Sequence, residues 1–174
     1  MTSVSQTTVR PYKEADISFI VGRVMVEVPK LPHYVGIKVE RKRVEQVMHD
    51  GLNNPTQFMA RMLWNDHKIV GGVCGYCVTQ LLSYDKMTGD IFLYIDPEYR
   101  SLTNVLKLMD AYKTWAIAQG ATIIMATQTG GLKGEKLGRL LERFGGYKQI
   151  GGIYYYQIPG VTNALADLSN VKAS

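Results

Sequence analysis

A strand, a proline-initiated turn and a long helix follow one another without interruption across residues 90–121. The apolar run 91–95 predicts a strand, Asp96 and Pro97 start a sharp turn, and the amphipathic pattern that follows predicts a helix closed by Gly120. The first N–H groups of such a helix have no intrahelical partners, and the positive end of the helix dipole lies beside them. We therefore expect an anion site here, suited to a phosphate-bearing cofactor.

Length and charge narrow the choice of partner. A chain of 174 residues fits one domain that buries roughly 70% of its unfolded surface. The net charge of +5 suits an acidic ligand such as a nucleotide cofactor, but the positive side chains are scattered apart from the run 41–43. That run lies on a predicted helix and is interpreted as a solvated face, so we expect no nucleic-acid partner.

The two cysteines, Cys74 and Cys77, have the spacing of a redox or zinc motif but lie within a predicted strand. Residues three apart on a strand point to opposite faces, so the thiols diverge and we expect buried thiols in a reducing compartment and no metal site. The first eight residues are polar, and no apolar run approaches the ~18 residues of a membrane span. We expect a soluble, cytoplasmic protein with no membrane partner.

The periodicity predicts one mixed α/β sheet in the order β-α-α-β-β-β-α-β-α-β. The expected strands are 9–12, 58–64, 68–79 (with a glycine-associated bulge), 91–95, 122–127 (buried on both faces) and 153–158. The expected helices start near residue 13, run from about 40 to 49 with Gly51 ending the helix, extend from the turn after Arg100 to the closing Gly120, and run from 135 to 144. Residues 83–89 are expected to be a hairpin loop. A single domain over residues 1–160 and a flexible tail over 161–174 complete the prediction.

Five landmarks occur in order along this pattern. They are Val9-Arg10-Pro11 with Glu14-Ala15-Asp16, then Ile69-Val70-Gly71-Gly72, then Tyr94-Ile95-Asp96-Pro97-Glu98-Tyr99-Arg100, then Trp115-Ala116 with Gln119-Gly120-Ala121, and finally Leu140-Leu141-Glu142-Arg143-Phe144-Gly145-Gly146-Tyr147. Together they resemble the GNAT (GCN5-related N-acetyltransferase) superfamily of acyl-CoA N-acyltransferases over residues 9–158. The arrangement also resembles GNAT-like proteins common in tailed-phage genomes.

The resemblance implies a mixed sheet with splayed central strands and acetyl-CoA as the cofactor. In the family, pantetheine lies along the strand before the signature, which here ends in Leu93, Tyr94, Ile95 and Asp96. The pyrophosphate would lie on the turn made by Arg100, Ser101, Leu102, Thr103, Asn104 and Val105. Gln128 matches a pantetheine-contacting position, and Lys133 is a candidate for the 3′-phosphate of coenzyme A.

The chain departs from the family pattern at two places that bear on activity. Thr103 and Val105 stand where the phosphate-binding turn usually has small residues, so their side chains either crowd the cofactor or point away from it. Leu141 stands where the family often has its acidic tyrosine. Tyr154 on the last strand is the alternative acid, and packing is the competing interpretation. Asp90 and Glu27 are the candidate bases.

The leading hypothesis is an N-acyltransferase that moves an acetyl group from acetyl-CoA directly to a primary amine of a small molecule, a protein lysine or a protein N-terminus. The alternative is a catalytically lapsed GNAT-like binding or structural protein, located in the host cytoplasm or the virion if it is viral. A different kind of nucleotide-binding protein is a third interpretation. Because dimers are frequent in the family, the resemblance also suggests a homodimer.

Overall fold

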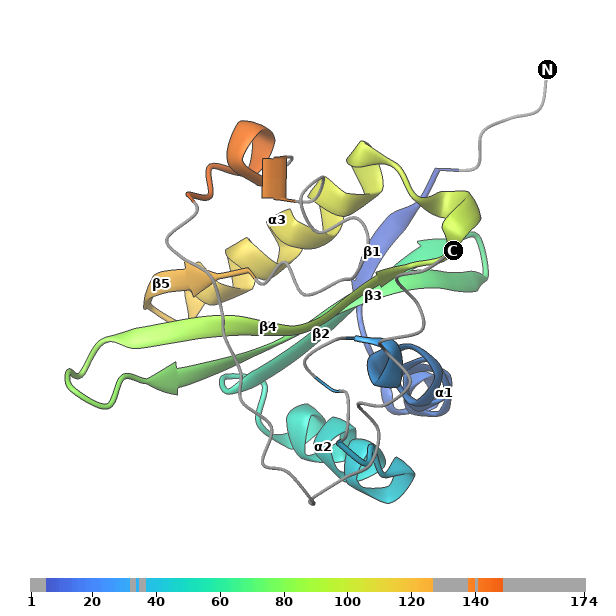
Figure 1. Ribbon diagram of the computed structural model, residues 1–174, viewed down its shortest axis with the longest axis horizontal. Helices are drawn as coiled ribbons and strands as arrows, with labels where there is room; N and C mark the ends of the chain where they lie inside the picture. Colours follow the sequence, from blue (N-terminus) through green and yellow to red (C-terminus); the bar gives the residue numbers. More distant parts are fainter. Residues whose placement is uncertain (1–5, 32–33, 35–36, 127–137, 140, 149–174) are drawn as a thin grey trace, which may run out of the picture.

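The computed structural model describes residues 6–31, 34, 37–126, 138–139 and 141–148. Within these residues the chain forms a five-stranded sheet in the order β1-β2-β3-β4-β5, with four antiparallel strands and β5 parallel to β4. The strands are β1 (Thr8–Pro11), β2 (Phe58–Asn65), β3 (Lys68–Thr79), β4 (Lys86–Ile95) and β5 (Ala121–Met125). Figure 1 shows β3 and β4 as a long ribbon across the molecule, with β5 beside only part of β4.

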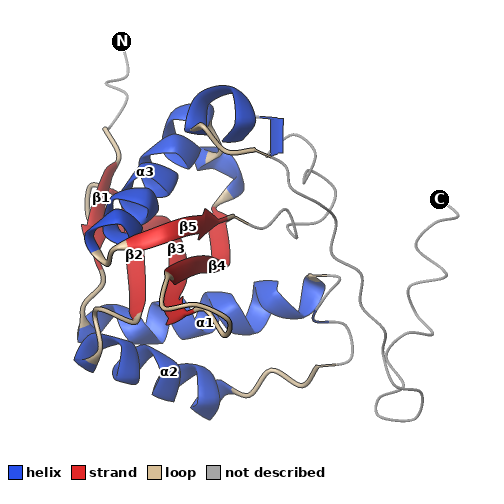
Figure 2. Ribbon diagram, turned by 90° about the vertical axis from the view of Figure 1, so that its left-hand side faces the viewer, coloured by secondary structure: helices blue, strands red, loops and turns tan. Residues whose placement is uncertain are grey.

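Helices cover both faces of this sheet (Figure 2). One layer contains α1 (Ile17–Glu27) and α2 (Arg41–Asn53), with short 3₁₀ turns η1 (Glu14–Asp16) and η2 (Val28–Lys30) at the two ends of α1. The other layer contains α3 (Leu102–Ala118) and the π-helical turn η6 (Leu141–Gly145). The 3₁₀ turn η4 (Pro97–Tyr99) connects β4 to α3. The predicted mixed α/β architecture is therefore confirmed.

The sheet separates two hydrophobic cores. The core on the α3 side includes Leu63, Val73 and Leu108, all fully buried. The core on the α1 and α2 side includes Val21 and Ala60, which are also fully buried. Cys74 belongs to the second core and Cys77 to the first, and both are buried free thiols. The prediction that these cysteines point to opposite faces is thus confirmed.

A bulge interrupts the pairing of β3 with β4. Cys74 pairs with Phe92 and Gly75 pairs with Asp90, so Ile91 is an extra residue in β4. The sequence predicted a bulge from the glycines of β3, and Gly75 lies at the register shift. As a consequence, Ile91 and its neighbour Phe92 both pack against the core on the α1 and α2 side. The bulge therefore places two consecutive side chains of β4 on the same face of the sheet.

Two predicted boundaries were wrong. Gly51 does not end α2, which continues to Asn53; a Cβ at Gly51 would collide with the ring of Phe58 and lie 2.7 Å from the Tyr12 hydroxyl. The residue is glycine because of close packing and not because the helix stops there. The expected hairpin loop 83–89 is shorter, because β4 already begins at Lys86 and pairs with β3 from Thr79 onward.

The expected double burial of the strand after α3 was also wrong. In β5, Ile123 is 43% exposed and Thr122 is exposed as well. The described residues give β5 a partner on one side only, which is β4. The expected strand 153–158 and part of the expected helix 135–144 lie outside the described residues, as does the expected tail. Within the described residues, no helix combines the length and apolar character that crossing a bilayer requires.

Candidate functional site

The N-terminus of α3 begins directly after the turn that ends β4, as the sequence predicted. Ser101 is the N-cap, and its Oγ accepts a hydrogen bond from the Asn104 amide at 3.2 Å. Among the described residues, no group accepts a hydrogen bond from the backbone amides of Leu102 and Thr103. These two donors and the positive end of a 17-residue helix form a site that can bind an anion.

The two residues that depart from the glycine pattern, Thr103 and Val105, lie in different environments. Thr103 is exposed to solvent, and Val105 packs against the core on the α3 side. Val105 also donates its amide to the Ser101 carbonyl at 3.1 Å. The sequence left open whether these side chains crowd the cofactor or point away; in the structure Val105 turns toward the core, and Thr103 is exposed at the surface.

Other residues of the turn hold its shape. Arg100 donates from Nε to the Ile95 carbonyl at 2.9 Å, which braces the turn against the end of β4. Asn104 is buried, and its side chain donates to the Tyr99 carbonyl at 2.7 Å and accepts from the Thr7 hydroxyl at 2.6 Å. The side chain of Asn104 is thus committed to the protein, and the free donors on this turn are backbone amides.

The predicted pantetheine strand has one unpaired segment in the described part of the chain. β5 pairs with β4 only from Lys86 to Gly89, whereas β3 pairs with β4 up to Ile95. Because β5 ends at Met125, opposite Gly89, the segment of β4 that ends in Asp96 pairs with β3 alone among the described residues. Leu93 and Ile95 direct their side chains into the core on the α3 side, and Tyr94 faces the α1 layer.

A cluster of polar side chains joins β4 to α1 on that layer. Asp96, 3% exposed, accepts a hydrogen bond from the Tyr94 hydroxyl at 2.8 Å and forms an ion pair with Arg23 at 2.9 Å. Lys68 lies 3.9 Å from the second carboxylate oxygen of Asp96. Burial, and then the hydrogen bond to Asp96, raises the pKa of Tyr94 to about 12. The hydroxyl of Tyr94 is therefore protonated at neutral pH.

The two candidate bases lie on opposite faces of the sheet. Glu27 ends α1, forms an ion pair with Lys30 at 3.1 Å, and is close enough to Tyr94 to contribute to raising its pKa. Asp90 lies beside the bulge, and its charge helps to raise the pKa of Tyr112 and of Tyr147, which pack in the α3 layer. The structure therefore does not bring Glu27 and Asp90 together into one acid–base pair.

The structure identifies a tyrosine that the sequence analysis did not select. The hydroxyl of Tyr147 is buried and has no hydrogen-bond partner within the described residues. Burial, then the charges of Asp90 and Asp110, raises the pKa of Tyr147 to about 12. In the sequence, the pair Gly145-Gly146 directly before Tyr147 indicates a tight turn. In the structure Gly146 has a φ of 72°, and Tyr147 packs against the core on the α3 side. Leu141, at the position of the family tyrosine, is buried in the core.

Three predicted site residues cannot be placed. Tyr154, Gln128 and Lys133 lie outside the described residues. For the described residues, no group of three or more histidine, cysteine or acidic side chains could hold a metal ion. Of the predicted site, the structure describes the strand 93–96, the turn 100–105 and the candidate bases Glu27 and Asp90.

Comparison with solved structures places this geometry in a known fold. An aminoglycoside acetyltransferase from an uncultured soil metagenomic sample is similar with a TM-score of 0.64 at 14% identity, over 88% of this chain and 98% of that one. Another, crystallised with sisomicin, gives 0.64 at 16% identity, over 87% and 96%. A GNAT family acetyltransferase of Staphylococcus aureus gives 0.57 at 12% identity, over 87% and 98%.

No protein-family model and no curated protein matches the sequence. The structural likenesses cover nearly all of each solved chain, and their identities of 12–16% are too low to carry activity or substrate with them. What they establish is architecture. The mixed sheet and the helix that follows the turn after β4 together have the fold of the GNAT acetyltransferases.

Proposed function

We propose that this chain is an N-acyltransferase that transfers an acetyl group from acetyl-CoA to a primary amine of a small molecule or a protein. The observation that carries the proposal is the pair of amides of Leu102 and Thr103, which have no acceptor among the described residues and lie just past a β4 segment that, among those residues, pairs with β3 alone. A diphosphate needs donors of this kind, and an extended pantetheine arm can pair with the free edge of a strand.

The proposed contacts follow the chain. The backbone of Leu93 to Asp96 would hold pantetheine, and the backbone amides of Leu102 and Thr103 would hold the pyrophosphate. Arg100 and Asn104 support this turn through the Ile95 and Tyr99 carbonyls. Gln128 and Lys133 remain candidates from the sequence for pantetheine and for the 3′-phosphate.

The reaction sets two proton-transfer tasks for the protein. When bound, acetyl-CoA supplies the activated acetyl thioester. A lysine-like amine has a pKa near ~10.4, so a base must take one proton from its ammonium form before the nitrogen bonds to the acetyl carbon. Glu27 and Asp90 are the proposed bases, one for each face of the sheet. The carbon–sulfur bond then breaks, Tyr154 or Tyr147 would give a proton to the departing sulfur, and the tyrosinate so formed would take up the second proton that the nitrogen loses as the amide forms.

A primary amine is the proposed acceptor of the acetyl group. One structural neighbour, an aminoglycoside acetyltransferase, was crystallised with sisomicin, which is consistent with an amine acceptor. On this chain Glu27 brings a carboxylate to the end of α1 beside Tyr94, where a cationic amine would be attracted. Holding the amine near the thioester would supply much of the rate through proximity.

One observation favours the alternative of a GNAT-like binding or structural protein without catalysis. Leu141, 3% exposed, packs in the core at the position where the family often has a tyrosine. On that hypothesis the chain would keep the fold and lack an acid for the sulfur. A location in the cytoplasm, or in a virus particle if the chain is viral, remains part of the proposal from the sequence.

Release of coenzyme A thiol tests the proposal. The protein would be incubated with acetyl-CoA and, in turn, an aminoglycoside, a polyamine and a lysine peptide, while free thiol is measured against time. We expect release with at least one amine, and a loss of about 100-fold in Glu27→Gln or Asp90→Asn. Glu45→Gln on the exposed face of α2 is the matched control. Bound acetyl-CoA with no thiol release for any amine would support the alternative.

A further inference from the structure

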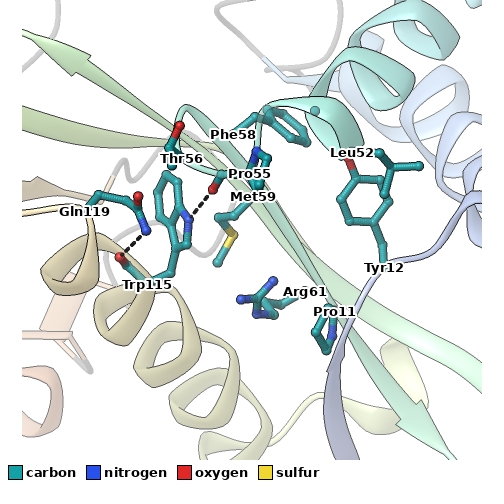
Figure 3. Close-up of a pocket in the computed structure, with 11 residues that line it drawn as sticks. Pro11, Tyr12, Leu52, Pro55, Thr56, Phe58, Met59, Arg61, Trp115 and Gln119 are labelled. Carbon is teal, nitrogen blue, oxygen red and sulfur yellow. Dashed lines mark hydrogen bonds between the residues drawn. The ribbon is translucent and has the colours of Figure 1, made fainter.

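A second hollow lies far from the N-terminus of α3. It has a volume of about 380 Å³, within the ~300–1,000 Å³ typical of small-molecule sites. Residues from the end of β1, the end of α2, the start of β2 and the end of α3 line it, as Figure 3 shows. From Leu102 to Trp115 the axis of α3 extends about 20 Å, so this pocket is separate from the proposed acyl-CoA site.

Arg61 brings a positive charge into this pocket from β2 (Figure 3). The hydrogen bond recorded for its guanidinium is a long one, from Nη1 to the Ala60 carbonyl at 3.3 Å. Within the described residues, no carboxylate lies within 4.0 Å of Arg61, in contrast to Arg23, which is paired with Asp96. Burial lowers the pKa of Arg61, which is the effect of removing a charge from water without compensation. A guanidinium has five N–H donors, and most of these remain available.

The walls around Arg61 are mainly apolar. Trp115 donates its indole N–H to the Pro55 carbonyl at 2.9 Å, and Tyr12 donates its hydroxyl to the Met48 carbonyl at 2.7 Å. The polar atoms of both rings are therefore already used, and the small part of each residue that remains exposed, 7% in both, is mainly hydrocarbon. Met59 adds a flexible apolar side chain between them (Figure 3).

We propose that this pocket binds a small carboxylic acid with an apolar ring, with its carboxylate on Arg61 and its ring against Trp115 and Met59. A guanidinium pairs with a carboxylate through two parallel hydrogen bonds, which fixes the orientation of the ligand. A phosphate or nucleotide fits less well, because Arg61 is the one cationic side chain among the described residues that line the pocket, and the rest of that lining is mostly hydrocarbon. The site goes beyond the proposed acetyl transfer and does not depend on it.

The direct test uses 3-phenylpropionate as the probe and its neutral amide, 3-phenylpropionamide, as the matched ligand. In ¹H–¹⁵N NMR spectra of the full chain, we expect the acid to shift the indole N–H signal of Trp115 and to leave that of Trp64 unchanged. The amide should bind at least about tenfold more weakly, because it lacks the charge that Arg61 recognises. Absence of binding by the acid at millimolar concentration, or equal binding of acid and amide, would overturn the proposal.

Variants test the role of the guanidinium. Arg61→Gln should weaken the acid about tenfold or more and remove the difference between acid and amide. Arg43→Gln, which removes a charge from the exposed face of α2, should bind both ligands as the unaltered chain does. Thr103→Asp should also bind the acid normally, which separates this pocket from the α3 N-terminus. Undiminished binding by a folded Arg61→Gln would contradict the proposal, and if that variant does not fold, the comparison of acid with amide on the unaltered chain decides.

Discussion

Arg23 Nη2 lies 2.9 Å from Asp96 Oδ1, and this ion pair fastens helix α1 to the residue where β4 turns toward α3. Asp96 is almost fully buried, while about one third of the Arg23 side chain remains exposed. The Tyr94 hydroxyl donates to the same carboxylate oxygen at 2.8 Å. The pair therefore helps to set the position of the turn that presents the free amides of α3.

Removing one partner of this pair should be costly, because it leaves a buried charge without compensation. We expect Arg23→Gln to lower the free energy of unfolding by about 2 kcal/mol, between the values for buried and exposed pairs. Adding Asp96→Asn should recover part of that loss. Urea unfolding of the two single variants and the double variant measures the coupling. Arg41→Gln breaks an exposed pair with Glu45 and should cost less than ~0.5 kcal/mol; equal losses in Arg23→Gln and Arg41→Gln would contradict this interpretation.

Two helical glycines should respond to alanine in opposite directions. A Cβ at Gly51 would meet the Phe58 ring and the Tyr12 hydroxyl, so Gly51→Ala should destabilise the protein by roughly 1–3 kcal/mol despite a better helix propensity. A Cβ at Gly22 in α1 would meet nothing within 4 Å, so Gly22→Ala should stabilise by up to ~1 kcal/mol. Urea unfolding compares the two, and the same sign for both would show that the packing at Gly51 is misassigned.

Stability should decline at alkaline pH through buried tyrosines. Burial, and then the nearby charge of Cys74, raises the pKa of Tyr12 from 10.0 to about 12 in the folded chain. The unfolded chain thus loses this proton first, so the stabilisation is complete below pH 10 and is lost as the pH rises toward 12. Between pH 10 and 12 the free energy of unfolding should therefore fall less steeply with pH in Tyr12→Phe, because one proton fewer is released on unfolding. Tyr84→Phe, at a fully exposed side chain, is the control, and identical slopes for both variants would refute the assignment.

Local signals were sufficient to predict most of the architecture. The strand, turn and helix from residue 91 to residue 118 were predicted because apolar period, Pro97, Ser101 and Gly120 all act within a few residues of each other. The start of β4 was misplaced because Lys86 to Gly89 look like turn residues, and only their pairing with β3 makes them a strand. Gly51 was misinterpreted for the same kind of reason, since its role depends on Phe58, which packs against it from the next strand.

For the candidate site, the sequence predicted the turn that leads into α3. The turn 100–105 could be selected from its order in the chain, and Ser101 does cap α3. The partner of Asp96 could not be predicted, because Arg23 lies in another helix and only the fold brings the two together. Tyr147 and Arg61 were not selected for a related reason. A single aromatic or basic residue carries no sequence signal of a site, and only its burial and its lack of partners among the described residues single it out.

The central claim is that a diphosphate binds the amides of Leu102 and Thr103, and calorimetry with acetyl-CoA on Thr103→Asp tests it most directly. An acidic residue in the first turn favours the helix, so this change should leave the protein folded, while its charge repels phosphate. Like charges near 4 Å cost about 1–4 kcal/mol, so we expect a loss of affinity of at least tenfold. Thr114→Asp, which adds the same charge near the other end of α3, should bind acetyl-CoA within about twofold of the unaltered chain. Unchanged affinity in Thr103→Asp, or no binding by the unaltered chain at millimolar acetyl-CoA, would contradict the account.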